Sequence, residues 1–346
     1  MSNTTDRGQF VWHELMTTDP EAAAGFYRAV VGWETKPWGN NLAYTLCVAP
    51  AGPVAGIMAL PDDARTAGAP PAWLSYVGTP DLDATIARAT GLGARVLKGA
   101  TAIEGAGRYA VLADPYGATF GVYTPAQSAP QPAVGPGQFV WHELTTSDVE
   151  AALGFYRALF GWGEMHRMDM GATGPYVIFG SDGTQRGGVY RSPPGDAGGS
   201  RWLAYMQVAS ADTTATTAVR AGARVLHGPA EVPGGRITMM LDPQGVAFAV
   251  HSARMEAKPA AAAKKPPAPK AKPAPKRQVA LKKKAPPRKK AAPKKKAAPA
   301  RRKPAAKKAT KRKAAKRSRP ARKVARKPAR KVARRAPRRK SARRHR

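Results

Sequence analysis

The sequence predicts an α+β protein in which four βαβββ modules form two glyoxalase-sized domains, followed by a disordered basic tail. The first observation is a repeat: Gly8–Leu15, GQFVWHEL, returns unchanged as Gly137–Leu144. The second is that strand and helix patterns occur twice within each copy. The third is a change of composition near residue 257, after which the sequence has no acidic or aromatic residue. We therefore read the first 256 residues as a duplicated domain.

The opening strand has two chemically different faces. Residues 9–16 alternate, so Phe10, Trp12 and Glu14 are expected on one face and His13 on the other. His13 is therefore assigned a structural or helix-facing role, and so is the equivalent His142 of the second copy. A one-residue bulge would reverse this assignment, because a register slip moves every side chain to the other face.

Caps and turn residues set the remaining elements of the first copy. Asp19 followed by Pro20 is typical of a helix start, and Gly32 of a helix end. A second helix is predicted over 81–92. The predicted strands after the first are 43–48, 54–60, 72–78, 94–97, 108–112 and 119–124, and the second copy repeats the pattern from Gln138 to His251.

The repeat and the composition together divide the chain into four segments. We predict one domain over residues 8–125 and a second over 137–253, joined by a proline-containing linker at 126–136. Residues 257–346 form the tail, which lacks the apolar surface needed to offset chain entropy and is predicted to be disordered.

Charge separates the tail from the rest of the chain. Residues 1–256 hold all 22 acidic residues and 17 of the 58 Lys and Arg, whereas residues 257–346 hold the other 41 and no acid. Such a Lys-, Ala- and Pro-rich segment resembles the tails of linker histones and is expected to bind nucleic acid nonspecifically through phosphates. Duplex DNA is favoured because the tail has no aromatic ring for stacking single strands. RNA, polyphosphate, an anionic membrane surface or a purely solubilising tail are the alternatives.

The expected location is the cytoplasm, in association with the nucleoid. Cys47 is the only cysteine, so it cannot form an intramolecular disulfide, and it is expected to be a small buried apolar residue. The first residues lack the apolar region of a signal peptide. No apolar run approaches the ~20 residues that a membrane span needs.

Two motifs recur in both copies, T-x-D…F-Y…G-W after the first strand and D-P-x-G before the last. The second motif stands at Asp114–Gly117 and at Asp242–Gly245. With the module order, these motifs resemble the vicinal oxygen chelate superfamily of glyoxalases, bleomycin resistance proteins and extradiol dioxygenases. The resemblance covers about residues 8–252. It implies that paired modules curl around a cleft, in which metal-using members place four ligands, usually His and Glu.

The ligand positions implied by this resemblance hold other residues here. The first and last positions fall on Trp12 and Gly121 in the first copy, and on Trp141 and Ala249 in the second. The other two strands that should supply ligands contain no His and no acid. We therefore expect no metal and no cofactor, because three or four N or O ligands are needed to hold a divalent ion.

The candidate ligand-binding residues are a tryptophan and a glutamate in each copy. Trp12 and Trp141 are either core residues or an aromatic wall of the cleft implied by the resemblance. Glu14 and Glu143 share that strand face, where partial desolvation would raise the pKa of the carboxyl group. Each could bind a cationic or hydroxylated ligand or act as a general base, and both are candidate catalytic residues.

Two arginines are further candidates. Arg108 and Arg236 recur in both copies just before a predicted strand. They are expected either to contact an anion in the cleft or to serve in a turn or a salt bridge. An arginine paired with Glu14 or Glu143 is the structural alternative to a functional role of those glutamates.

The sequence supports three functional hypotheses. The first is a metal-free, bleomycin-resistance-like protein that binds a small aromatic or amphipathic molecule and is tethered to DNA by its tail. The second is an enzyme of the lyase, isomerase or hydroxylase type, either metal-free with Glu14 or Glu143 as base or with a metal bound through an unexpected strand register. The third is a nucleoid architectural protein whose duplicated domains serve as a spacer.

Overall fold

The computed structural model describes residues 7–39, 41–127, 134–193, 195–196 and 199–254. The tail predicted over residues 257–346 and most of the linker lie outside these ranges. Within the described ranges, the helices are too short or too polar to span a lipid bilayer.

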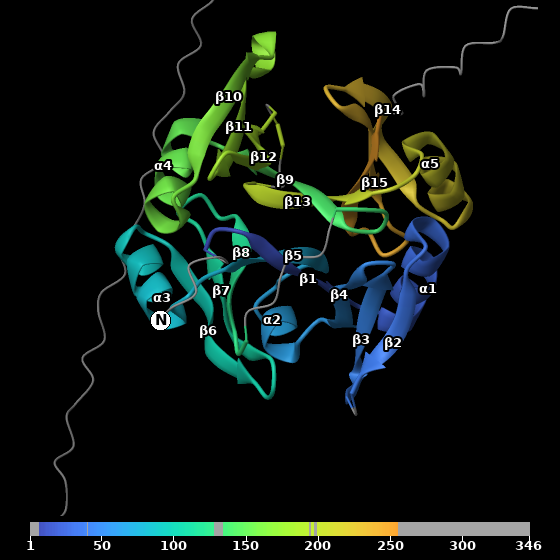
Figure 1. Cartoon of the computed structure of the whole chain (residues 1–346), viewed down its shortest axis with the longest axis horizontal. Helices are drawn as coiled ribbons and strands as arrows, with labels where there is room; N and C mark the ends of the chain where they lie inside the picture. Colours follow the sequence, from blue (N-terminus) through green and yellow to red (C-terminus); the bar gives the residue numbers. More distant parts are fainter. Residues whose placement is uncertain (1–6, 40, 128–133, 194, 197–198, 255–346) are drawn as a thin grey trace, which may run out of the picture. The chain divides into compact units, whose positions relative to one another are not determined.

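Each copy forms one eight-stranded sheet, as the four predicted modules require (Figure 1). The strand orders are β2-β3-β4-β1-β5-β8-β7-β6 and β10-β11-β12-β9-β13-β16-β15-β14. The first sheet contains β1 (Phe10–Thr17), β2 (Glu34–Trp38), β3 (Asn41–Ala49), β4 (Gly52–Ala59), β5 (Ala72–Gly78), β6 (Arg95–Ile103), β7 (Gly107–Ala113) and β8 (Thr119–Pro125). The second contains β9 (Phe139–Thr146), β10 (Gly163–Asp169), β11 (Pro175–Ser181), β12 (Thr184–Arg191), β13 (Arg201–Gln207), β14 (Arg224–Val232), β15 (Gly235–Leu241) and β16 (Ala247–Ala253).

The first strands of the two modules of a copy meet at the middle of its sheet. β1 pairs antiparallel with β5, and within each module the first and last strands, such as β1 and β4, run parallel. Figure 1 shows both sheets curved, with the central pairs β1/β5 and β9/β13 back to back and the outer strands bending away. The concave faces therefore point in opposite directions.

The predicted helices begin and end close to where the sequence places them, whereas the short helix at Asp62–Thr66 was not predicted. The side chains of Asp19, Asp81 and Asp148 cap the first turns of α1, α3 and α4, and Gly32 and Gly161 end α1 and α4 with φ of 83° and 82°. The helices are α1 (Pro20–Val31), α2 (Asp62–Thr66), α3 (Leu82–Gly91), α4 (Val149–Phe160) and α5 (Ala211–Arg220), with a short 3-10 helix at Gly171–Thr173.

The hydrophobic cores are shared between the copies. Helix α1 packs beside α5 and α3 beside α4, so each core combines the first module of one copy with the second module of the other (Figure 1). Phe26 lies against Phe248 at a ring distance of 5.7 Å, and Phe120 lies against Phe160 at 6.0 Å. Separating the copies would expose both cores to water, which is unfavourable in proportion to the apolar area exposed.

The two repeated motifs meet across the copies. The Tyr156 hydroxyl donates to Asp114 at 3.0 Å, and the Tyr27 hydroxyl donates to Asp242 at 3.2 Å. In each pair the tyrosine comes from the F-Y motif of one copy and the aspartate from the D-P-x-G turn of the other. The aspartate also accepts hydrogen bonds from its own turn, so one carboxylate orders the turn and joins the copies.

A second contact between the copies corrects the predicted alternation of β1. The register shifts between Phe10 and Trp12, and this bulge turns Phe10 toward the other copy, where it stacks on His142 at 3.5 Å. Phe139 stacks on His13 at 3.6 Å in the same way. The two buried histidines face each other with their Nε2 atoms 2.7 Å apart, and burial lowers the pKa of both, that of His142 to about 3. The expected face of Phe10 was therefore wrong, whereas His13 does point away from Trp12.

Candidate ligand-binding site

The concave face of the first sheet holds a buried glutamate between two tyrosines. The Tyr44 hydroxyl donates to Glu14 Oε1 and the Tyr76 hydroxyl donates to Glu14 Oε2, both at 2.9 Å. The Trp12 indole N–H donates to the Tyr44 oxygen at 3.0 Å. These residues come from β1, β3 and β5, so the arrangement is fixed by the middle of the sheet. We call this concave face the first cleft.

The second copy repeats the arrangement. The Tyr176 and Tyr205 hydroxyls each donate to one oxygen of Glu143, both at 2.7 Å. The Trp141 indole N–H donates to the Tyr176 oxygen at 3.0 Å. We call this concave face the second cleft. Of the six predicted site residues, the structure therefore gathers four into two matching sites, one tryptophan and one glutamate in each.

Glycines make room for the tyrosine rings. A Cβ at Gly56 would overlap the Tyr44 hydroxyl, and a Cβ at Gly121 would overlap the Tyr76 ring. Gly188 leaves the same space for the Tyr176 hydroxyl of the second copy. Gly121 is the position where the resemblance implied a metal ligand, and its missing side chain admits an aromatic ring that reaches the glutamate.

The environment of each glutamate favours its protonated form more than water does. Burial raises the pKa of Glu14 and of Glu143, and the hydrogen bonds from the tyrosines partly oppose that effect. A carboxyl group whose pKa moves toward neutrality can accept or return a proton. Each site therefore offers a proton-transfer group, phenolic oxygens and an indole face within one apolar wall.

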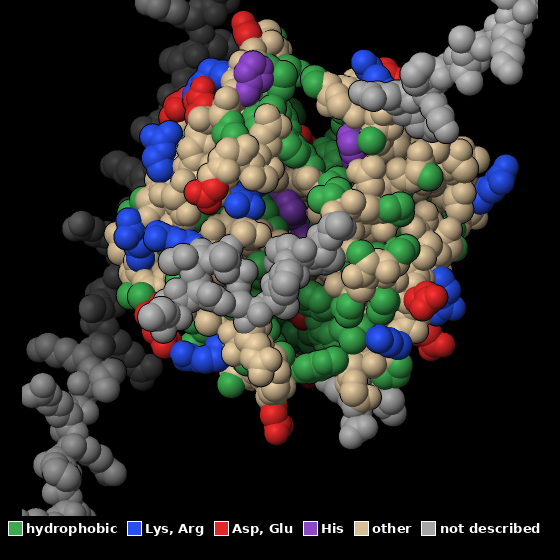
Figure 2. Space-filling model, in the orientation of Figure 1, with side chains coloured by type: hydrophobic (Ala, Val, Ile, Leu, Met, Phe, Trp, Pro, Cys, Tyr) green, Lys and Arg blue, Asp and Glu red, His purple; other side chains and the backbone are tan. Residues whose placement is uncertain are grey.

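Further aromatic rings extend both clefts toward their rims. Each lies 5.8–6.0 Å from the ring of a tyrosine that binds the glutamate. Figure 2 shows the molecule hollowed between the outer strands, with apolar side chains on the walls of the hollow. The additional rings are Trp38 and Tyr109 in the first cleft and Tyr190 in the second.

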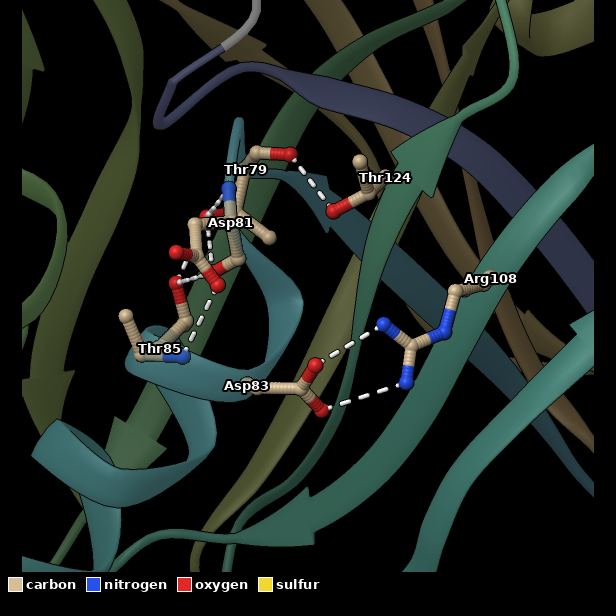
Figure 3. A network of polar contacts seen from close by, with 7 residues as sticks. Thr79, Asp81, Asp83, Thr85, Arg108 and Thr124 are labelled. Atoms are coloured by element: carbon tan, nitrogen blue, oxygen red, sulfur yellow. Dashed lines mark hydrogen bonds and ion pairs between the residues drawn. The ribbon is translucent and has the colours of Figure 1, made fainter.

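The two candidate arginines lie away from the glutamates. Arg108 of β7 forms a bidentate ion pair with Asp83 at the start of α3, with distances of 2.8 and 3.2 Å (Figure 3). Arg236 pairs with Asp212 and with Glu231 at 2.7 and 2.6 Å. A salt bridge was one of the roles that the sequence analysis predicted for these arginines. The alternative that they pair with the site glutamates is wrong, because tyrosines occupy that place.

Comparison with known proteins places the chain in a family. A model of a glyoxalase-like domain matches residues 11–123, and the model of the glyoxalase/bleomycin resistance protein/dioxygenase superfamily matches residues 138–250. CFP32 of Mycobacterium tuberculosis, provisionally named a glyoxylase, is 32% identical over 244 residues, which are 69% of this chain and 92% of that protein. The anthracycline biosynthesis protein DnrV of Streptomyces peucetius is 32% identical over 271 residues, 74% of this chain and 96% of that protein. The chain belongs to the glyoxalase/bleomycin resistance protein/dioxygenase superfamily.

Solved structures share the fold at low sequence identity. Homoprotocatechuate 2,3-dioxygenase from Arthrobacter globiformis aligns with a TM-score of 0.54 and 15% identity, covering 71% of this chain and 80% of that one. The Mn(II)-bound glyoxalase from Novosphingobium aromaticivorans aligns with a TM-score of 0.50 and 16% identity, covering 71% and 82%. These likenesses confirm the predicted architecture of four modules in two domains.

The residues of the clefts do not fit the metal centre found in some superfamily members. Both oxygens of the carboxylate at each site accept hydrogen bonds from tyrosines. Within the described ranges, no three His, Cys, Asp or Glu side chains gather as a metal site requires. The donor set is therefore phenolic and carboxylic.

Sequence reasoning missed the four tyrosines. Tyr76 of β5 and Tyr205 of β13 occupy equivalent positions in WLSYV and WLAYM. Tyr44 of β3 and Tyr176 of β11 also occupy equivalent positions. The duplication could have revealed these tyrosines, because a polar aromatic residue that is present in both copies on strands of the predicted cleft is a candidate for lining that cleft.

Proposed function

We propose that this chain binds a small, hydroxylated aromatic or amphipathic molecule in its clefts. The observation that carries the proposal is the duplicated array of tryptophan, tyrosine and glutamate on the concave face of each sheet. Indole and phenol rings supply a stacking surface, and the carboxyl group orients a hydroxyl or cationic group of the ligand. The names of CFP32 and DnrV support a small organic molecule as ligand.

Binding can be tested with 1,4-dihydroxyanthraquinone, a fused aromatic probe that carries two hydroxyl groups. The full chain should bind it and quench tryptophan fluorescence, whereas the double variant Glu14→Gln/Glu143→Gln should bind at least about tenfold more weakly. Glutamine keeps the size of the side chain but cannot accept a proton. Equal affinity of the two proteins would contradict the proposal, provided that circular dichroism shows the same fold.

Catalysis is a second candidate function, favoured by the raised pKa of both glutamates. A carboxylate whose pKa is raised by burial is a stronger base and could remove a proton from a carbon next to a carbonyl group, as in a lyase or an isomerase. Turnover of thiol adducts of methylglyoxal or of catechols, lost in the same double variant, would support this function. Binding of the probe without turnover of any such compound supports a sensor or sequestering protein.

We assign the tail a separate role, nonspecific attachment to duplex DNA. The proposal rests on the sequence alone, since 41 Lys and Arg without an acid favour a polyanion. Removing residues 257–346 should leave a folded protein without DNA affinity. The affinity of the full chain should fall by about 10³–10⁵ between 50 and 200 mM salt if 6–10 phosphates are contacted. A truncated protein that still retards DNA at moderate salt would contradict this division of labour.

A further inference from the structure

Each cleft contains a carboxyl group without a cationic partner among the described residues. Glu14 is half-buried and Glu143 is buried, and the ion pairs of the described residues include neither of them. Their hydrogen bonds come from tyrosine hydroxyls, which are neutral donors. Such bonds replace part of the hydration that a carboxylate loses on burial, but they leave its charge in place. Each cleft therefore carries an uncompensated negative charge whenever its glutamate is ionised.

The basic side chains of the outer strands do not neutralise these carboxylates. Lys98 of β6 pairs with Asp63 at 3.2 Å, and the two candidate arginines are held by other acids. His227 of β14 is exposed, and its charge acts on Glu143 without an ion pair between the two side chains. A full positive charge beside either glutamate must therefore come from outside the described residues.

Partly exposed aromatic rings border the glutamate of each cleft. In the first cleft, the hydroxyl of Tyr44 joins Trp12 to Glu14, and the ring of Trp38 lies 5.8 Å from that of Tyr44. The second cleft repeats this arrangement, with a stacked ring at 6.0 Å in the place of Trp38. The half-buried rings are those of Trp12, Trp38 and Tyr44 in the first cleft and of Trp141, Tyr176 and Tyr190 in the second.

Aromatic rings gathered beside a carboxylate favour a cation over a neutral group. The face of an aromatic ring carries partial negative charge, so it attracts an ammonium group that lies within about 6 Å of its centre. This attraction contributes about 0.5–2 kcal/mol, and it is the interaction by which aromatic cages bind quaternary ammonium ions. The carboxylate adds a direct Coulomb attraction, which is stronger in a partly desolvated site than in water.

We propose that the ligand of the clefts carries a substituted ammonium group, which lies beside Glu14 or Glu143 and between the aromatic rings. The chemical class is an aromatic or amphipathic amine or quaternary ammonium compound. Its positive charge supplies the partner that each carboxylate lacks, and its apolar part covers the rings. This inference rests on the proposed function, because it concerns the same clefts and narrows the class of ligand.

The test compares two probes that differ at one atom. 4-Hydroxyphenyltrimethylammonium and 4-tert-butylphenol share their shape and their hydroxyl group, but the first has a positive nitrogen where the second has a carbon. Isothermal titration calorimetry of the full chain should give an affinity for the cation that is at least about tenfold higher, equivalent to about 1.4 kcal/mol. The hydrophobic effect opposes this result, because the neutral probe is the more apolar one.

Two double variants test the carboxylates and the rings separately. Glu14→Gln/Glu143→Gln removes both charges at nearly constant size, so the ratio of the two affinities should fall to about one. Trp38→Leu/Tyr190→Leu keeps the glutamates and removes two rings that form no hydrogen bond with them, so the ratio should fall by about two- to fivefold. Circular dichroism should show the same fold for each variant.

A matched control removes two charges outside the clefts. Glu21 of α1 and Glu150 of α4 are exposed residues at equivalent helix positions. Glu21→Gln/Glu150→Gln changes the net charge by the same amount as the cleft variant, so it should leave the ratio of affinities unchanged. A ratio that falls equally in both variants would show that the preference comes from net charge, and this would overturn the inference.

The remaining outcomes separate failure of the inference from failure of the proposed function. Equal affinities for the two probes, tighter binding of 4-tert-butylphenol, or a ratio that persists in the glutamine variant would overturn the inference. Binding of 1,4-dihydroxyanthraquinone in those cases would leave the proposed function standing. If neither phenol nor 1,4-dihydroxyanthraquinone binds the full chain, the proposed function and the inference fail together.

Discussion

The first copy holds Glu14 between two tyrosine hydroxyls at 2.9 Å, and the second copy holds Glu143 between two at 2.7 Å. The outer strands and connections of the two copies differ, because Lys98 of β6 pairs with Asp63 of α2, whereas the equivalent position of β14 holds His227. The floor of each cleft, where the glutamate and its tyrosines lie, is built mainly from the central strands of the sheet. These strands also carry the shared cores on their opposite face. The rim is built from connections and outer strands, where changes cost little packing. The two copies therefore share the chemistry of the floor and differ in the connections and outer strands around it.

The largest expected effect tests whether the two shared cores behind the floors are equivalent. Leu15 and Leu144 are fully buried at the same position of β1 and β9. Leu15→Ala and Leu144→Ala should each lower the free energy of unfolding by about 2–5 kcal/mol, because each leaves a cavity. Urea denaturation measures both values. A loss in one copy only would show that the copies do not share the cores as described.

The next effect concerns the tyrosines that reach the glutamates. Tyr76→Phe and Tyr205→Phe each remove one donor to a buried carboxyl group, so each should cost about 1–3 kcal/mol of stability. Each should also raise the pKa of its glutamate further, because the donor favoured the charged form. Carbon NMR of the labelled carboxyl groups measures that pKa. A pKa that stays unchanged in either variant would mean that the tyrosine does not control the glutamate.

Acidification tests the contact that joins the copies. Burial lowers the pKa of His13 and His142, so between the folded pKa, about 3 for His142, and the ordinary value of 6.5 the unfolded chain binds more protons. The free energy of unfolding is therefore highest above pH 6.5. Below that pH it falls by up to about 1.4 kcal/mol per pH unit for each ring. The double variant His13→Gln/His142→Gln should show a shallower pH dependence. Equal slopes in urea denaturation from pH 7 to 4.5 would contradict the assignment.

The smallest effect is a control on the helices. Gly25 of α1 and Gly154 of α4 stand at equivalent helix positions, and a Cβ at either meets no atom within 4 Å. Gly25→Ala and Gly154→Ala should each stabilise the protein by about 0.5–1 kcal/mol, because alanine loses less backbone entropy on folding. Thermal unfolding measures both. Destabilisation by either variant would mean that its helix packs more tightly than described.

Much of the fold could be predicted from the sequence because the same pattern of motifs occurs in both copies. The repeat of GQFVWHEL, the aspartate caps and the D-P-x-G turns predicted the modules, and alternation in β1 placed Trp12 and Glu14 together. The bulge after Phe10 could not be predicted, because nothing local distinguishes it from regular strand. The partners of Glu14 were also missed, since they come from strands whose register only the folded sheet determines.

The most direct test of the account is a crystal structure of the full chain with 1,4-dihydroxyanthraquinone. The account predicts the probe in a cleft, stacked against Trp12 or Trp141, with a hydroxyl group within hydrogen-bonding distance of Glu14 or Glu143. A probe bound between the two copies or on the outer surface, with both glutamates still enclosed by their tyrosines and untouched, would contradict it.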